Sequence, residues 1–283
     1  MSDEIFARAE ATESVEEVGD DGAKGGFFRL LAYRLAFGLV ILFLWQFASD
    51  RIVDSYWVSK PTRVFDQLME MVVSKEIFVH FFDTMINTFW GYVLGAIVGI
   101  CIGFLLAEYQ TVASVLEPYI MAFNGVPRIA YAPLFIVWFG IERESKVILV
   151  ATIVFFLTFT NTFAGIRGVS VDLVNVARIM GGRKLGILRK VILPSAAPWI
   201  INGLKVSLPF SLVGAIVGEF IAASSGLGYL LQLYMNLYNT TGVILIILIL
   251  MATVIFLNIV LNAIEGHLLR WRPVTEQKEV SPS

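Results

Sequence analysis

The sequence has few charged residues and almost no cysteine or histidine. Of 283 residues, 16% are charged, one is cysteine and two are histidine, whereas 57% are hydrophobic. The lone Cys101 excludes an intrachain disulfide and a cysteine metal cluster, and we expect no metal site. A mean hydropathy of +0.77 lies outside the range of soluble globular domains. The expected solvent of this chain is therefore a lipid bilayer.

Several catalytic and nucleotide-binding motifs are also missing. No Gly-x4-Gly-Lys-Ser/Thr phosphate loop occurs, so the chain is not expected to bind ATP by itself in the usual way. No Ser-His-Asp arrangement, His-Glu-x-x-His motif or pair of intramembrane aspartates occurs either, which disfavours an intramembrane protease or another hydrolase. We expect no catalytic residue and no cofactor bound by this chain.

The N-terminal segment differs in composition from the rest of the chain. Residues 1–26 contain no long apolar run, and eight of them are Asp or Glu, which is typical of a disordered tail. The first apolar run follows this tail and continues past Trp45, which indicates a retained membrane helix and not a signal peptide. The expected organisation is a disordered acidic tail over 1–26, a membrane domain over 27–272 and a C-terminal tail over 273–283.

Six apolar segments approach the roughly 20 residues of helix that cross a bilayer core. They predict an all-α membrane protein with about six transmembrane helices: Leu30–Ala48, Met85–Ala107, Leu116–Phe139, Val147–Ile166, Trp199–Ala223 and Val243–Ile264. The fifth segment is interrupted by Pro209. Lys and Arg gather before the first segment, after the last and in the connection between the fourth and fifth, so both termini and this connection are predicted to be cytoplasmic.

Two isolated charges lie within these apolar segments. Arg128 stands between Pro127 and Pro133, two prolines that remove backbone donors from the third segment, and Glu219 stands near the end of the fifth. A charge at membrane depth is expected to face a cavity or a counterion, so we hypothesise an Arg128–Glu219 interaction. A structural ion pair and an anion-binding role for Arg128 remain open, and the prolines either border a solute pathway or simply kink the helix.

The connection from Val171 to Pro194 carries the most specific pattern in the chain. Apolar residues recur at helical intervals on both sides of Gly181 and Gly182, which predicts two short amphipathic helices joined by a glycine turn. Its apolar stripe and basic surface suit insertion into a groove on another protein. From composition alone, a basic loop that only sets the orientation is an equal alternative.

The spacing within this loop resembles the cytoplasmic signature of the binding-protein-dependent ATP-binding-cassette importer permeases. That signature is Glu-Ala-Ala, three residues, Gly, nine residues and Ile-x-Leu-Pro, and here it aligns without a gap with Asn175-Val176-Ala177, Gly181 and Val191-Ile192-Leu193-Pro194. Asn175 and Val176 replace the family's glutamate and first alanine, which leaves one polar contact in question. Segments 124–140, 217–220 and 226–230 look like the taurine, sulfonate, nitrate and pyrimidine-precursor branch.

The resemblance implies a type I importer permease of a bacterial inner membrane, without an ATPase site of its own. It implies a second permease copy, two cytoplasmic subunits that use ATP and magnesium, and an external solute-binding protein, with no nucleic acid involved. The implied ATPase-coupling residues are Asn175, Ala177, Arg178, Gly181, Leu193 and Pro194. The residues expected at the translocation pathway or gate are Pro127, Arg128, Pro133, Glu219, Gly226, Leu227 and Gly228.

Two other classes of protein remain as alternatives. An ion-gradient-driven secondary transporter would use Arg128 and Glu219 as a relay, although such proteins usually show inverted repeats and more spans. A membrane scaffold would need neither the loop nor the proline-containing segment. Association with an ATPase subunit distinguishes the importer from both.

Overall fold

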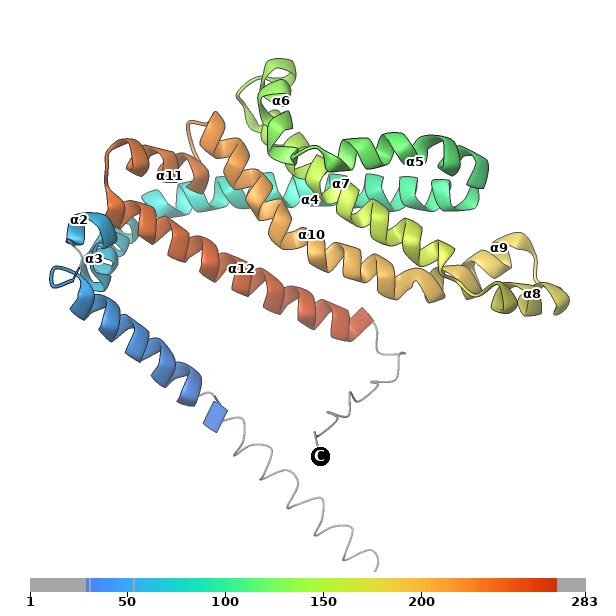
Figure 1. Cartoon of the computed structure of the whole chain (residues 1–283), viewed down its shortest axis with the longest axis horizontal. Helices are drawn as coiled ribbons and strands as arrows, with labels where there is room; N and C mark the ends of the chain where they lie inside the picture. The colour runs from blue at the N-terminus through green and yellow to red at the C-terminus, as the bar shows by residue number, and fades with distance from the viewer. Residues whose placement is uncertain (1–28, 31, 53, 269–283) are drawn as a thin grey trace, which may run out of the picture. The chain divides into compact units, whose positions relative to one another are not determined.

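The computed structural model describes residues 29–30, 32–52 and 54–268, and these residues form helices without an extended strand. The predicted tails, 1–26 and 273–283, lie outside the described residues. Contacts divide the chain into two compact units, with the boundary after Asp66. Figure 1 labels the helices in chain order, and each unit is described by itself below.

The first unit contains the helix Ala32–Ala48, the short helix α2 (Ser55–Val58) and the first residues of α3 (Pro61–Val73). Trp45 Nε1 donates to the carbonyl oxygen of Val58 at 3.1 Å and ties the helix to the last residue of α2. The Lys60 ammonium lies 2.5 Å from the Asp50 carboxylate. Hydrogen bonds from Lys60 and Ser55 lower the pKa of Asp50 to about 2.

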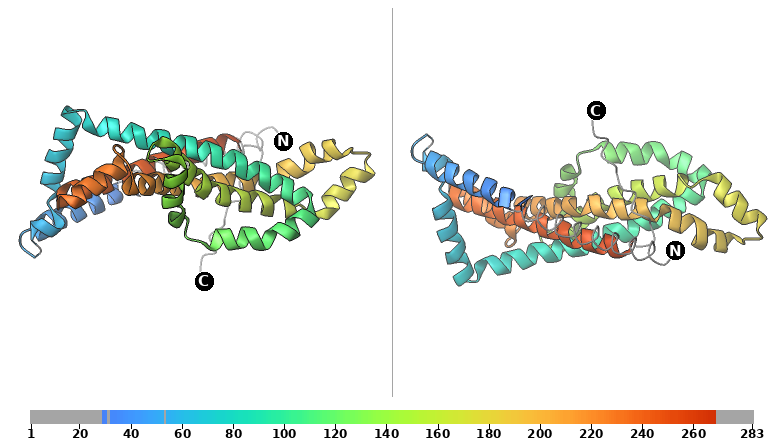
Figure 2. Two further views of the ribbon diagram at one scale, coloured as in Figure 1. Left: turned by 90° about the horizontal axis from the view of Figure 1, so that it is seen from above. Right: turned by 90° about the horizontal axis from the view of Figure 1, so that it is seen from below.

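The second unit is built around three long helices, α4 (Glu76–Glu108), α7 (Arg143–Arg167) and α10 (Leu193–Ile221). Its remaining elements are α5 (Gln110–Gly125), the 3-10 turn η1 (Arg128–Tyr131), α6 (Ala132–Phe139), α8 (Val171–Ile179), α9 (Lys184–Ile187), the π-helical turn η2 (Leu188–Ile192), α11 (Leu227–Asn236) and α12 (Thr240–Leu268). Figure 2 shows α4 and α7 running side by side.

Glycines set the close approach of α4 to α7. Gly91, Gly95, Gly99 and Gly103, here called the glycine row, recur every fourth residue and so lie on one face of α4. A Cβ atom added to any of them would come within 3.0 Å of α7. Each later glycine of the row lies against later residues of α7, from Val150 beside Gly91 to Thr162 beside Gly103, so the two helices are parallel. Small residues let membrane helices approach through their backbones.

Helix α10 packs antiparallel against α7. A Cβ on Gly203 would lie 2.7 Å from Asn161 Cβ, whereas one on Gly218 would lie 3.2 Å from Lys146 Cγ, so residue numbers run in opposite directions along the pair. Asn202 Nδ2 also donates to Asn161 Oδ1 at 3.1 Å. The C-terminal end of α10 therefore lies with the N-terminal ends of α4 and α7.

The predicted apolar segments are all helical, with two differences from the expected form. Four stretches are long and apolar enough to cross a membrane: Glu76–Glu108, Arg143–Arg167, Lys184–Ile221 and Thr240–Ala263. The first segment is helical over the described residues Ala32–Ala48, and the third is broken between Pro118–Gly125 and Arg128–Phe139 by a 90° bend. Pro209 does not interrupt the fifth segment, because α10 continues through it.

Candidate functional site

The loop Val171–Pro194, called the two-helix loop from here on, has the predicted form. Helix α8 ends at Ile179, the chain turns, and α9 begins at Lys184. Gly181 adopts φ +80°, a left-handed conformation that favours glycine, and the Gly182 N–H donates to the Ala177 carbonyl at 2.9 Å. The glycine turn predicted from the sequence is confirmed.

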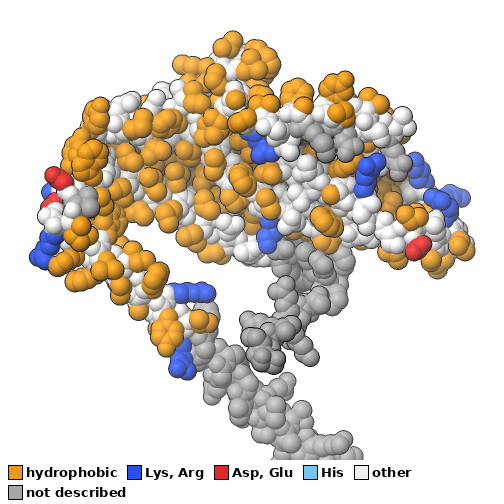
Figure 3. Space-filling view, viewed as in Figure 1, with side chains coloured by type: hydrophobic (Ala, Val, Ile, Leu, Met, Phe, Trp, Pro, Cys, Tyr) orange, Lys and Arg blue, Asp and Glu red, His pale blue; other side chains and the backbone are white. Residues whose placement is uncertain are grey.

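Apolar side chains on this loop point away from the rest of the chain. Ile179 and Met180 are 85% and 83% exposed, and Leu173 and Val176 are also exposed. Figure 3 shows hydrophobic and Lys or Arg side chains together over α8 and α9. Large exposed apolar residues beside basic ones are typical of surfaces that bind another macromolecule.

The inner side of the two-helix loop faces the end of α4. Lys184 Nζ lies 2.5 Å from Glu108 Oε1 at the last residue of α4. A cavity of about 690 Å³ lies behind the loop, with Phe104, Arg178 and Leu188 among its lining residues. Asn175 and Arg178 are exposed, whereas Ala177 is half-buried. The ion pair ties the loop to one of the long helices.

At the end of the two-helix loop, the helix continues through Leu193 and Pro194 into α10. Residues Lys184 to Ile221 form one stretch of 38 residues, and the π-helical turn Leu188–Ile192 ends two residues before Pro194. A proline ring clashes with the carbonyl four residues earlier in a regular helix, and a π turn is one known way to relieve such a clash. The chain thus enters the fifth apolar segment through a local bulge in the helix.

The prolines of the third segment have different positions from those expected. Pro127 precedes η1 at the break, whereas Pro133 lies in the first turn of α6. A proline in a first turn removes no intrahelical donor that would otherwise be used. Pro133 therefore starts a helix, and a break replaces the single kinked helix.

Arg128 lies at the break against the middle of α7. Its Nη2 donates to Asn124 Oδ1 at 2.6 Å, and its guanidinium carbon lies 5.8 Å from the centre of the Phe156 ring. Its Nε is buried without a hydrogen-bond partner, and no carboxylate within the described ranges lies within 4 Å of it. The hypothesised pairing with Glu219 is not present, since both side chains contact other residues.

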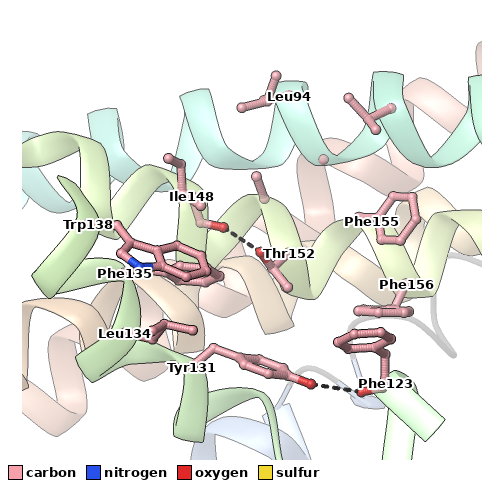
Figure 4. Close-up of a pocket in the computed structure, with 13 residues that line it drawn as sticks. Leu94, Phe123, Tyr131, Leu134, Phe135, Trp138, Ile148, Thr152, Phe155 and Phe156 are labelled. Atoms are coloured by element: carbon pink, nitrogen blue, oxygen red, sulfur yellow. Dashed lines mark hydrogen bonds between the residues drawn. The ribbon is translucent and has the colours of Figure 1, made fainter. Parts of the chain in front are cut away.

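Next to this break lies an apolar cavity of about 470 Å³ between α4, α6 and α7 (Figure 4). Figure 4 shows Tyr131, Phe135 and Phe156 directed toward it, and the Tyr131 hydroxyl donates to the carbonyl oxygen of Phe123 at 3.2 Å. Carbon atoms make up nearly all of its lining surface. The broken segment therefore borders an apolar cavity.

Glu219 is the most enclosed charged residue among the described side chains, with an exposure of 0%. It accepts hydrogen bonds from Thr84 Oγ1 at 2.8 Å, from Asn87 Nδ2 at 3.0 Å and from the backbone N–H of Gly228 at 3.1 Å. Gly226 has φ +109°, and a side chain there would collide with the Glu219 carboxylate. The structure thus brings Glu219, Gly226, Leu227 and Gly228 together.

Three residues that contact this cluster, His80, Thr84 and Asn87 on α4, are not among the site residues predicted from the sequence. They recur at intervals of four and three residues, which places them on one helical face. That periodicity was available in the sequence, but it gave no indication of a partner more than 130 residues away.

Taken together, a bundle of long apolar helices, a broken membrane segment beside a cavity and an exposed two-helix loop define a multi-span membrane transport protein. Residues 68–271 match the family described as binding-protein-dependent transport system inner membrane component, and the chain belongs to this family. It is an ATP-binding-cassette importer permease of the all-α, type I class.

Named relatives agree with the suspected branch. A Bacillus subtilis protein named as an aliphatic sulfonates transport permease, SsuC, is 33% identical over 82% of this chain and 85% of its own length. The formylaminopyrimidine transport permease ThiX of Halalkalibacterium halodurans is 28% identical over 83% and 94%. The taurine transport permease TauC of Escherichia coli is 26% identical over 80% and 84%.

Solved structures give the same fold. The MetNI methionine ABC transporter in an inward-facing conformation aligns with a TM-score of 0.60 at 20% identity, covering 70% of this chain and 96% of the other. An amino acid ABC transporter with histidines aligns with a TM-score of 0.56 at 19% identity, covering 72% and 98%. The helical arrangement is shared even where few residues are.

Proposed function

We propose that this chain forms the transmembrane path of a bacterial ATP-driven importer and moves a small solute delivered by an external solute-binding protein. Two copies pair in the membrane, and two cytoplasmic ATPase subunits, which use ATP and magnesium, dock against them. The chain performs no covalent chemistry itself. The two-helix loop faces the cytoplasm, and both termini lie on that side.

The observation that carries this proposal is the position of the two-helix loop at one end of a continuous helix. Lys184–Ile221 joins the loop to the far end of the bundle, a length of roughly 57 Å at 1.5 Å per residue. The exposed Ile179 and Met180 supply the apolar contact for an ATPase groove. When the ATPase subunits close on ATP, they displace the loop, and the long helix carries this displacement through the membrane.

The solute class follows from the relatives and from Arg128. Named relatives transport sulfonates, taurine and a pyrimidine derivative. Arg128 provides a cation at membrane depth without a carboxylate partner in the described part of the chain. A small anionic or heterocyclic solute fits both, with Pro127, Arg128 and the Gly226–Gly228 segment near the pathway or gate.

A matched pair of glycine substitutions tests the docking role. A Cβ atom at either Gly181 or Gly186 would meet nothing within 4 Å, but only Gly181 has a positive φ. Gly181→Ala should therefore strain the turn by about 1 kcal/mol and misplace Ile179 and Met180, whereas Gly186→Ala should not. The chain is co-purified with its ATPase subunit, and coupled ATP hydrolysis is measured.

We expect reduced association and reduced coupled hydrolysis in Gly181→Ala, and a larger loss in Gly181→Val. Gly186→Ala should match the unmodified chain. Equal behaviour of all variants, or no association with any ATPase subunit even for the unmodified chain, would remove the docking role and favour the ion-driven transporter.

A further inference from the structure

Helix α11 has an unusual N-terminus, because other helices supply its capping groups. The first N–H groups of a helix have no intrahelical partner and are usually capped by a nearby side chain. Here three successive backbone N–H groups donate to side chains of α4 and α10: Gly226 to His80 Nδ1 at 3.1 Å, Leu227 to Thr84 Oγ1 at 2.8 Å and Gly228 to Glu219 Oε2 at 3.1 Å.

Thr84 links the two halves of this arrangement. Its hydroxyl accepts from the Leu227 N–H and donates to Glu219 Oε2, so one side chain of α4 holds both α11 and α10. Glu219 receives three donors, and its negative charge lies at a helix N-terminus, where a negative charge is stabilised. With an exposure of 0%, this carboxylate has no free face for a solute.

The position of the cluster gives it a mechanical role. Glu219 lies two residues before the end of the stretch Lys184–Ile221, and the two-helix loop lies at the opposite end of the same stretch. A continuous helix transmits displacement along its axis, so the start of α11 follows α10 only while the cluster holds it. Gly226 and Gly228 leave room for no side chain between α11 and Glu219.

We propose that Thr84, Asn87 and Glu219 are positioning residues that lock the start of α11 to α10 and α4, so that these three ends move as one body through the transport cycle. Glu219 is then not a solute contact but the anchor of the Gly226–Gly228 segment. This inference rests on the proposed function, because the movement originates at the two-helix loop.

Three threonine variants isolate the hydroxyl that joins the helices. Thr84→Val keeps the shape of the side chain but leaves the Leu227 N–H without its acceptor, and Thr84→Ser restores a hydroxyl. Thr88→Val is the matched control, since Thr88 is also buried on α4 and its hydroxyl donates only within that helix, to the Thr84 carbonyl at 2.7 Å. A purely structural loss of a buried hydroxyl should affect Thr84→Val and Thr88→Val alike.

The readout is a distance between α4 and the end of α11. In a full-length Cys101→Ser background, Val79→Cys and Leu237→Cys, both at exposed positions, receive spin labels, and pulsed electron paramagnetic resonance is recorded in lipid nanodiscs. When the labelled chain is diluted with an excess of unlabelled Cys101→Ser chain, so that only one copy of a pair carries labels, the unmodified cluster, Thr84→Ser and Thr88→Val should each give one narrow distance population. Thr84→Val should raise a second population by about tenfold, because a buried N–H has lost its partner.

With the ATPase subunits bound, the distance in the unmodified cluster should be the same before and after trapping with ATP and vanadate. Thr84→Val should still co-purify with the ATPase, since its two-helix loop is intact, but its distance should change on trapping. Identical distributions for Thr84→Val and Thr88→Val would overturn the proposal, as would a nucleotide-dependent distance in the unmodified cluster. If no ATPase associates, the proposed function fails, while the nucleotide-free distances still decide whether the lock exists.

Discussion

Glu219 shows how a buried carboxylate is tolerated in an apolar helix. Burying an ionised group is costly unless other groups satisfy it, and here three donors and a helix N-terminus do so. The buried Lys146 of α7 lies beside Gly218, the residue before Glu219: a Cβ atom added to Gly218 would lie 3.2 Å from Lys146 Cγ. Glu219 is buried, and its hydrogen bonds are satisfied, by residues of other helices and not by its neighbours in sequence.

Removing the carboxylate should therefore destabilise the chain strongly. We expect Glu219→Ala to lower the free energy of unfolding by about 3–5 kcal/mol, because the Gly228 N–H, Asn87 and Thr84 lose their acceptor. Each unsatisfied donor costs about 1–3 kcal/mol, and removal of a buried charge offsets part of the sum. Glu219→Gln should cost less, since its amide oxygen still accepts but its NH₂ group faces donors. Unfolding by SDS titration in mixed micelles measures the difference, with the exposed Glu144→Ala as the control. A cost for Glu219→Ala equal to that of Glu144→Ala would contradict this account.

The separation of Arg128 from Glu219 makes a second prediction at this scale. Because Arg128 contacts Asn124 and Phe156 while Glu219 contacts Thr84 and Asn87, the effects of Arg128→Met and Glu219→Gln on unfolding should add to within about 0.5 kcal/mol. The single and double variants are compared in the same titration. A coupling energy well above that value would restore the ion pair that the sequence suggested.

These residues also show the limits of sequence reasoning. Arg128 and Glu219 were recognisable as isolated charges, and that recognition needs only the surrounding apolar sequence. Their partners were not recognisable, because Thr84 and Glu219 are 135 residues apart and a lone sequence gives no distance between them. Pairing the two conspicuous charges was a natural hypothesis, but neutral Thr, Asn and backbone N–H groups satisfy Glu219 instead.

At the scale of elements, local patterns predicted what local physics determines. Helical periodicity and two glycines predicted the two-helix loop. The positive φ of Gly181 explains why glycine occupies that position. Proline was a poorer guide, since Pro133 begins a helix, Pro209 lies inside one and Pro127 adjoins a break.

The glycine row makes a testable claim about the pairing of α4 with α7. A side chain at Gly99 would collide with Thr158 and with the backbone of Phe155, so Gly99→Val should lower the free energy of unfolding by about 1–3 kcal/mol or more. Gly38→Ala is the control, because a Cβ atom there meets nothing within 4 Å. Thermal unfolding followed by tryptophan fluorescence compares the two, and equal midpoints would show that the helices do not approach as closely as described.

At the scale of the whole molecule, the direction of each helix fixes which ends share a membrane face. Parallel α4 and α7 with antiparallel α10 place Glu108, Arg167 and the two-helix loop at one end, and the start of α7 with the Glu219 cluster at the other. The distribution of Lys and Arg predicts that the loop end faces the cytoplasm. The ion pair between Lys184 and Glu108 agrees with this grouping of ends, although it does not by itself choose the side.

The orientation can be measured on two exposed positions at opposite ends of the bundle. In a Cys101→Ser background, Met180→Cys lies in the two-helix loop and Leu237→Cys lies at the end of α11, and both side chains are well exposed. A membrane-impermeant maleimide should label Leu237→Cys in right-side-out vesicles and Met180→Cys only in inverted vesicles or after permeabilisation. Labelling of Met180→Cys from outside would reverse the orientation, because the basic loop would then lie where no cytoplasmic ATPase can reach it. Labelling of Met180→Cys only in inverted or permeabilised vesicles would place the apolar surface of Ile179 and Met180 on the same side as ATP. The proposed transmission of movement from the ATPase subunits through the long helix requires this placement.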